Sequence, residues 1–208
     1  DSVCVACPAG TRSSSAATSC GACSEGQYQN VTGSALCKHC AVGKYLNDTA
    51  ARHESQCTDC VRGQHQDVAG SALCKDCAKG QYQNANGSAL CKECQVGRQG
   101  DSTGLIYDQW NLAVDSCKNC SMGRYGFTTG LKDDAECEAC PTGMWNDKEG
   151  QIRTEKYPPN DYRNYNAKGK PCQNCTEGRW SDVPGLHNNT QCKFCVWSFT
   201  DQNETWDF

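Results

Sequence analysis

The stretch that decides the fold is "GQYQNVTGSALCKHC", residues 26–40, which returns as "GQHQDVAGSALCKDC" at 63–77 and as "GQYQNANGSALCKEC" at 80–94. Each copy begins with a glycine, places a ring two residues later and ends in a Cys-x-x-Cys pair. A segment that recurs along a chain indicates a repeat array, in which each unit packs mainly on its neighbours. The sequence therefore predicts a tandem array of small units.

The repeated pattern extends along the whole chain. All 20 cysteines lie in ten Cys-x-x-Cys pairs, namely Cys4/Cys7, Cys20/Cys23, Cys37/Cys40, Cys57/Cys60, Cys74/Cys77, Cys91/Cys94, Cys117/Cys120, Cys137/Cys140, Cys172/Cys175 and Cys192/Cys195. Glycine stands three residues after nine of these pairs, at Gly10, Gly26, Gly43, Gly63, Gly80, Gly97, Gly123, Gly143 and Gly178. A ring follows two residues later in seven of the nine, at Tyr28, Tyr45, His65, Tyr82, Tyr125, Trp145 and Trp180. We expect the glycine to adopt a positive φ in a tight turn, and the ring to fold over a disulfide in a very small apolar cluster.

Covalent bonds must replace a missing apolar core. Leu, Ile, Val and Phe supply only 24 of the 208 residues, a content typical of chains that do not fold by hydrophobic burial alone. Twenty cysteines indicate either a disulfide array in an oxidising compartment or a metal–thiolate array in a reducing one. The spacing of the pairs is close to that of zinc ribbons, so a zinc array is the main alternative.

Two observations favour disulfides and a secreted protein. Seven of the 14 asparagines begin the glycosylation signal Asn-x-Ser/Thr, at Asn30, Asn47, Asn86, Asn119, Asn174, Asn188 and Asn203. The net charge is −4 and no dense Lys/Arg run is present, which argues against the nucleic-acid partners that stacked zinc modules commonly serve. We therefore expect an extracellular or cell-surface location reached through the secretory pathway, N-linked glycans, no nucleic acid, and no cofactor or metal.

The sequence contains no predicted membrane span, because no run of 18 or more apolar residues is present. The chain begins at Asp1 with neither Met nor a signal peptide. We expect either that a leader was removed or that these residues are a segment of a longer protein.

The array begins with regular units and continues with longer loops. The predicted segments are 1–94 with regular repeats, 95–140 with an expanded loop at 95–116, 141–195 with a Tyr-rich loop at 141–171, and an aromatic tail at 196–208. In the tail, Trp197 and Phe199 alternate with polar residues, as in a half-buried strand.

The long loop and the tail concentrate the residue types that are enriched at binding interfaces. The predicted partner-contact residues are Trp145, Tyr157, Tyr162, Tyr165, Trp197, Phe199, Trp206 and Phe208. The alternative is that these rings pack on their own repeats. We expect the partners to be other copies of the chain or other extracellular proteins.

Spacing narrows the disulfide connectivity to two schemes, because bonds within each pair would close small strained rings that hold nothing together. In the forward scheme the second cysteine of each pair bonds the first cysteine of the next, giving Cys7–Cys20, Cys23–Cys37, Cys40–Cys57, Cys60–Cys74, Cys77–Cys91, Cys94–Cys117, Cys120–Cys137, Cys140–Cys172 and Cys175–Cys192. In the interlocked scheme neighbouring pairs bond each other, as in Cys4–Cys20 with Cys7–Cys23. We favour the forward scheme because "GSALCK" recurs at single intervals between pairs. It leaves Cys4 and Cys195 to bond residues outside this segment or cysteines of neighbouring molecules.

The pattern Cys-x-x-Cys-x-x-Gly-x-Tyr, followed about ten residues later by Cys-x-x-Cys, resembles the ephrin-receptor-like cysteine-rich repeat. It also resembles the first sub-module of tumour-necrosis-factor-receptor repeats. "CSEGQYQNVTGSALCKHC" and "CAKGQYQNANGSALCKEC" carry the likeness best, and it extends from Cys4 to Cys195. The expanded loops and the last pair, which lacks the glycine, depart from the pattern. The resemblance implies forward pairing, and it implies the kind of repeat found in receptor ectodomains and in surface or flagellar-hair proteins of algae and other protists.

The expected fold is therefore a set of small disulfide-rich repeats, forming an elongated rod of Cys-x-x-Cys loops with short β segments, little helix and no large core. We expect a non-enzyme, because no nucleophile–base set, phosphate-binding loop or pair of carboxylates stands out. The acidic run "KDDAECE" at 132–138 is expected to be a solvated loop rather than a calcium site.

The function that this pattern favours is a structural one, as a disulfide-stapled subunit of an extracellular surface filament, flagellar hair or matrix. The alternative is a receptor or secreted recognition ectodomain that binds a protein ligand through the loop at 141–171.

Overall fold

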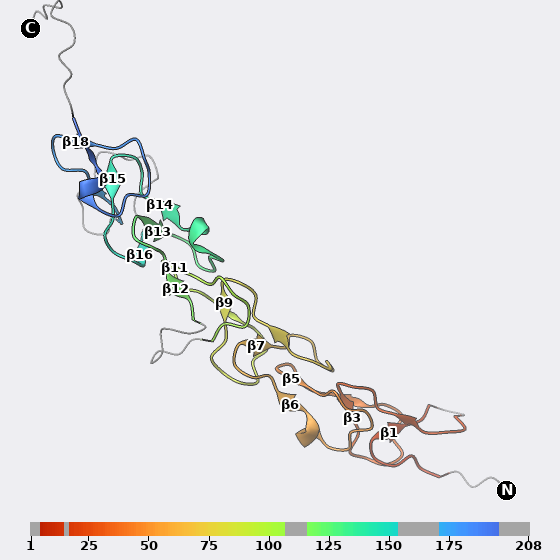
Figure 1. Cartoon of the computed structure of the whole chain (residues 1–208). Coiled ribbons are helices and arrows are strands. Elements are labelled where there is room, and N and C mark those ends of the chain that lie inside the picture. The colour runs from red at the N-terminus through yellow and green to blue at the C-terminus, as the bar shows by residue number, and fades with distance from the viewer. Residues whose placement is uncertain (1–4, 15–16, 107–115, 154–170, 196–208) are drawn as a thin grey trace, which may run out of the picture. The chain divides into compact units, whose positions relative to one another are not determined.

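The computed structural model describes residues 5–14, 17–106, 116–153 and 171–195 (Figure 1). Among these residues the secondary structure consists of strands of two or three residues and the 3-10 helices η1 (Glu54–Gln56), η2 (Asp134–Glu136) and η4 (Asn189–Gln191), with no α-helix. The strands are β1 (Thr11–Arg12), β2 (Gly21–Ala22), β3 (Gln27–Tyr28), β4 (Lys38–His39), β5 (Lys44–Tyr45), β6 (Thr58–Asp59), β7 (Gln64–His65), β8 (Lys75–Asp76), β9 (Gln81–Tyr82), β10 (Lys92–Glu93), β11 (Arg98–Gln99), β12 (Lys118–Asn119), β13 (Arg124–Gly126), β14 (Glu138–Ala139), β15 (Met144–Trp145), β16 (Gln151–Ile152), β17 (Gln173–Asn174), β18 (Arg179–Trp180) and β19 (Lys193–Phe194). These short strand pairs confirm the predicted class of small disulfide-rich repeats.

The described chain contains nine disulfides, and all of them follow the forward scheme. They are Cys7–Cys20, Cys23–Cys37, Cys40–Cys57, Cys60–Cys74, Cys77–Cys91, Cys94–Cys117, Cys120–Cys137, Cys140–Cys172 and Cys175–Cys192. We number the repeats 1 to 9 by these bonds in chain order. The array falls into two compact units. The first comprises Asp1–Lys118 and Thr128–Glu136, and the second comprises Asn119–Phe127 and Cys137–Phe208.

Each repeat is built on one short antiparallel strand pair. In repeat 2, β3 follows the glycine and pairs with β4, which lies between the two cysteines of the next pair, in the register Gln27↔His39 and Tyr28↔Lys38. The N–H of Cys40 extends the ladder by donating to the carbonyl of Gly26 at 2.8 Å. The same arrangement joins β1–β2, β5–β6, β7–β8, β9–β10, β11–β12, β13–β14, β15–β17 and β18–β19.

Three backbone hydrogen bonds join repeat 4 to repeat 5. The N–H of Gly63 donates to the carbonyl of Gln83 at 2.8 Å, and the N–H of Gln66 donates to the carbonyl of Ser88 at 3.1 Å. In the opposite direction, the N–H of Gly87 donates to the carbonyl of Cys60 at 2.8 Å. This third bond is present at eight junctions. Its donor N–H and acceptor carbonyl belong to Gly33 and Cys7, Ala50 and Cys23, Gly70 and Cys40, Gly87 and Cys60, Gly104 and Cys77, Gly130 and Cys94, Gly150 and Cys120, and Gly185 and Cys140.

The predicted cluster of ring and disulfide is present, and the disulfide belongs to the following repeat. Tyr28 of repeat 2 is buried with Cys40 and Cys57, which close repeat 3. Tyr82 packs in the same way against the Cys94–Cys117 bridge. In place of one continuous core, the described chain contains small separate clusters that combine a ring with the cysteines of a disulfide.

The glycine after each pair has the predicted positive φ, between +75° and +85° at all nine positions. It also faces the repeat two places further along. A Cβ at Gly26 would lie 2.0 Å from the carbonyl oxygen of Gly70, and a Cβ at Gly123 would lie 2.2 Å from that of Gly185. At Gly178, in the last described repeat, a Cβ would meet no described atom within 4 Å. The glycine is therefore required for close packing as well as for its turn.

We predict that Gly123→Ala destabilises the protein more than Gly178→Ala. Both residues have a φ of +78°, so both variants incur the roughly 1–2 kcal/mol cost of a left-handed alanine. At Gly123 the methyl group must also displace the carbonyl of Gly185, which should cost about 1–3 kcal/mol more. Urea unfolding followed by tryptophan fluorescence measures the difference. An equal decrease in the free energy of unfolding in the two variants would show that the close contact at Gly123 does not affect stability.

Candidate functional site

The candidate site is the surface at which one repeat contacts the next, which we call the junction. In the three near-identical copies, a buried glutamine amide holds the loop that forms this contact. Gln29, Gln66 and Gln83 directly follow the ring in the three near-identical copies, and each is at most 3% exposed. The amide nitrogen of Gln66 donates to the carbonyl of Leu73 at 2.5 Å, while its oxygen accepts from the N–H of Val68 at 3.1 Å. The side chain thus holds both ends of the loop that carries the turn.

Sequence reasoning missed these glutamines, although they recur in all three copies. Asn146 takes the same place in repeat 8, where its oxygen accepts from the N–H of Lys148 at 2.9 Å and its nitrogen donates to the carbonyl of the same residue at 3.0 Å. In repeat 9 the shorter side chain of Ser181 makes a matching pair of bonds with Val183. Chemically different side chains therefore accept from the same backbone N–H, two residues further along the chain, although the carbonyl that each one reaches differs.

We predict that Gln66→Met lowers the free energy of unfolding by about 1–3 kcal/mol, because it removes the two hydrogen bonds that hold the ends of the turn loop. Gln64→Met is the matched control, since Gln64 lies two residues away, is only half-buried, and its amide donates to the exposed carboxylate of Asp76 at 2.9 Å. That variant should change stability by no more than about 0.5 kcal/mol. Chemical denaturation compares the two. A Gln66→Met protein as stable as the Gln64→Met protein would contradict the predicted role.

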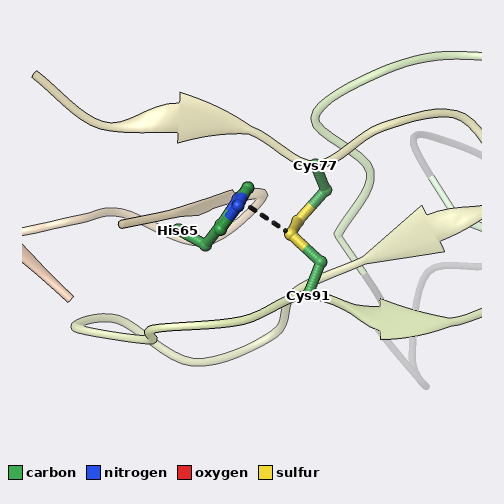
Figure 2. A group of neighbouring side chains, drawn as sticks. All are labelled: His65, Cys77 and Cys91. Carbon is green, nitrogen blue, oxygen red and sulfur yellow. Dashed lines mark hydrogen bonds between the residues drawn. A yellow bond between two sulfur atoms is a disulfide. The ribbon is translucent and has the colours of Figure 1, made fainter. Parts of the chain in front are cut away.

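His65, Cys77 and Cys91 form the one group of potential metal ligands among the described residues, with ligand atoms within 4.8 Å of one another. Figure 2 shows the ring of His65 directed at the disulfide between the two cysteines, and its Nδ1 lies 3.2 Å from Sγ of Cys91. Thiolates bind metals, whereas these sulfurs are bonded to each other. His65 therefore takes the place that tyrosine takes in other repeats, packed against the disulfide of the next repeat.

We predict that EDTA leaves the thermal unfolding midpoint unchanged and that a thiol reductant lowers it, because the sulfurs bridge each other and do not hold a metal. His65→Tyr is the control, since it installs the ring found at the same place in neighbouring repeats and should retain the midpoint with and without EDTA. A destabilisation by EDTA that is lost in the His65→Tyr variant would instead reveal a metal site.

The acidic run at 132–138 uses its carboxylates to satisfy protein donors. Asp133 accepts from the N–H groups of Ala135 and Glu136 at 2.9 and 3.1 Å, which caps η2. The carboxylate of Glu136 accepts from the N–H of Lys132 at 2.6 Å. Glu138 accepts from the hydroxyl of Tyr125, and burial together with this contact raises the pKa of Tyr125 to about 12. Three of the four carboxylates in this run therefore accept hydrogen bonds from the protein's own donors.

The predicted glycosylation sites are accessible wherever they are described. Asn30, Asn47, Asn86, Asn119, Asn174 and Asn188 are all exposed. Asn203 lies outside the described residues.

Of the predicted partner-contact residues, only Trp145 is described, and it occupies the ring position of repeat 8. It lies in β15, paired with β17, and its indole N–H donates to the carbonyl of Asn174 at 3.1 Å. Its side chain is half-buried, and its backbone also bridges Leu186 of the next repeat. Tyr157, Tyr162, Tyr165, Trp197, Phe199, Trp206 and Phe208 lie outside the described residues.

The two ends of the array carry incomplete versions of the junction. The dipeptide inside a Cys-x-x-Cys pair is a paired strand in nine of the ten pairs, whereas Val5–Ala6 is in no strand among the described residues. Val5 is 79% exposed. At the other end, Cys195 is exposed and is the one described cysteine without a disulfide. Cys4 lies outside the described residues.

The repeat itself matches a known family. Residues 10–57 and 63–105 match the family described as tyrosine-protein kinase ephrin type A/B receptor-like. These two segments carry ephrin-receptor-like repeats. These matches span less than half of the chain and confirm the predicted resemblance there, whereas the likeness to tumour-necrosis-factor-receptor repeats stays a prediction. The matched family is a receptor-like repeat and not an enzyme family.

No curated protein matches the chain. Within the described residues, no helix is long and apolar enough to cross a membrane.

Proposed function

We propose that the protein is an extracellular structural protein, a glycosylated and disulfide-stapled rod that acts as a subunit of a surface filament, flagellar hair or matrix. The junction is the observation that supports this most directly. One backbone hydrogen bond, from the turn of each repeat to the opening cysteine of the repeat before it, recurs eight times with the same polarity. An interface that repeats with one polarity adds units in one direction, which suits an extended spacer.

The covalent chemistry supports the proposed location. The described chain contains nine disulfides. Disulfides persist in oxidising compartments and are rare in cytosolic proteins. Six described sequon asparagines are exposed, so oligosaccharides attached there would face solvent.

Electron microscopy of the native material tests the proposal. We predict ordered fibres in which the chain is the repeating subunit, and we predict that a thiol reductant disperses them, because the repeats depend on their disulfides. Antibody labelling against residues 26–40 identifies the chain along the fibre. Native material that contains only discrete, unassembled molecules would rule out the structural function.

The description of the matched family favours a second candidate, a receptor or secreted recognition ectodomain that binds a protein ligand through the loop at 141–171. This candidate predicts a monomer whose binding to cells or to an extracellular protein is lost when residues 154–170 are deleted. Because Cys140 and Cys172 lie outside the deletion, the disulfide of repeat 8 can still form. Removal of the expanded segment at 107–115 is the control and should leave binding unchanged.

A further inference from the structure

We propose that the bridge between Cys77 and Cys91 is a thiol–disulfide exchange site, at which His65 stabilises the thiolate of Cys91 and the co-reactant is a low-molecular-weight thiol such as glutathione. This inference adds a chemical site to repeat 5 and goes beyond the structural function proposed above. It depends on the contact between a histidine and a disulfide that Figure 2 shows.

The contact joins a ring nitrogen to a sulfur. Nδ1 of His65 lies 3.2 Å from Sγ of Cys91, a hydrogen-bonding distance for sulfur. A disulfide sulfur has no hydrogen and can only accept, so the hydrogen lies on Nδ1 and is donated to Cys91. The chain has four histidines, and within the described part of the chain only His65 is grouped with a pair of cysteines. The rings of Tyr28 and Tyr82, at the corresponding bridges, contain no nitrogen.

The donated N–H stabilises the reduced form of the bridge more than the oxidised form. A disulfide sulfur is a weak acceptor, whereas a thiolate has a full negative charge, and hydrogen bonds to charged groups are the stronger ones. Thiols beside histidine are accordingly the more acidic and reactive ones. The contact therefore shifts the equilibrium of this bridge toward the dithiol. A hydrogen bond to a charged group changes such an equilibrium by about tenfold to hundredfold.

The two sulfurs have different surroundings, and each suits a different product. Cys77 is fully buried, where a neutral thiol is tolerated as a small apolar group and a thiolate is not. Cys91 is half-buried and contacts His65, so the negative charge is stabilised there. Because Cys91 is the more exposed sulfur, it is also the one that an incoming thiol reaches first. Cys91 is thus both the site of the mixed disulfide and the final thiolate.

The exchange balances with two molecules of glutathione. The thiolate of the first attacks Sγ of Cys91, the bond to Cys77 breaks, and the Cys77 sulfur takes a proton from solvent. The thiolate of the second attacks the glutathione sulfur of the mixed disulfide and releases Cys91 as a thiolate, which accepts the hydrogen bond from His65. The bridge gains two electrons, and the two glutathiones are oxidised to one glutathione disulfide. Since a more acidic thiol is the better leaving group, His65 speeds the second step.

Opening this bridge affects one junction. The three backbone hydrogen bonds between repeats 4 and 5 involve Gln83, Gly87 and Ser88 of repeat 5. All three residues lie inside the loop that Cys77 and Cys91 close. Reduction at this site therefore loosens the junction between repeats 4 and 5 while the other bridges stay closed.

A redox titration of the whole chain tests the proposal. Wild-type protein and the His65→Tyr variant are equilibrated under native conditions in mixtures of reduced and oxidised glutathione, with EDTA present to exclude metal ions. After acid trapping and alkylation, mass spectrometry measures the reduced fraction of each bridge. Cys60–Cys74 is the internal control, because it closes a near-identical copy with the same sequence separation of 14.

In the wild type, the equilibrium constant for reduction of Cys77–Cys91 should exceed that of Cys60–Cys74 by about tenfold to hundredfold. In the His65→Tyr variant this difference should disappear, because tyrosine retains the ring and lacks the N–H. Equal reduction of the two bridges in the wild type, or an unchanged difference in the variant, would overturn the proposal.

A second set of variants separates the hydrogen bond from packing. Tyr82 packs against the Cys94–Cys117 bridge, so Tyr82→His places a ring nitrogen at a bridge that has none in the wild type. Tyr82→His should make Cys94–Cys117 easier to reduce by a similar factor, whereas Tyr82→Phe should leave it nearly unchanged. Equal effects of the two substitutions would assign the lability to packing and reject the role of the N–H.

The charge on Cys91 supplies a readout that packing does not change. After selective reduction at neutral pH, the wild type should show the ultraviolet absorbance of a thiolate, and Cys91 should react rapidly with iodoacetamide. In the His65→Tyr variant, fully reduced at the same bridge, the absorbance should be lost and alkylation of Cys91 should be slower by about tenfold or more. Equal alkylation rates of Cys91 in the two proteins would show that His65 does not stabilise the thiolate.

Discussion

Backbone hydrogen bonds between neighbouring loops hold this chain together, and the disulfides make those bonds attainable. Closing a loop of about 15 residues contributes roughly 3 kcal/mol in the chain-entropy model. In repeat 4, the bridge from Cys60 to Cys74 keeps the turn at Gly70 and strand β7 in one register. Each loop then presents donors and acceptors that match the loop beside it. A chain with so few apolar residues gains its order from these closed loops.

Each disulfide also has a second role, because it supplies apolar surface to the preceding repeat. The ring of Tyr28 belongs to repeat 2, but it is buried against the bridge that closes repeat 3. Cys40, at one end of that bridge, is fully buried. The loss of one bridge would therefore open its own loop and uncover the ring before it. Covalent closure and packing are in this way coupled from repeat to repeat, which is how an array without a common core becomes cooperative.

Much of the fold could be predicted because cysteine and glycine have few structural roles. The recurrence of "GSALCK" at single intervals favoured forward bridges over interlocked ones, and the recurring glycine indicated a left-handed turn at residues such as Gly26. The contact from Gly26 to the carbonyl of Gly70 could not be predicted, since it joins repeats two apart and depends on how they stack. The role of Gln66 was equally hidden, because glutamine is usually exposed and only the structure reveals its burial and its two bonds.

The irregular repeats show which part of the unit is free to vary. In repeat 6 the bonds from Gly104 to Cys77 and from Gln83 to Leu105 are kept, and the extra residues come only after Leu105, before Cys117. Repeat 8 follows the same rule, with its insertion between β16 and Cys172. Lengthening a closed loop costs little, because closure entropy grows slowly with length. The family match ends at residue 105, where the first insertion begins, although the stacking bonds continue to Gly185. The junction is thus more general than the sequence pattern that identifies it, and expanded loops can be added without altering the stack.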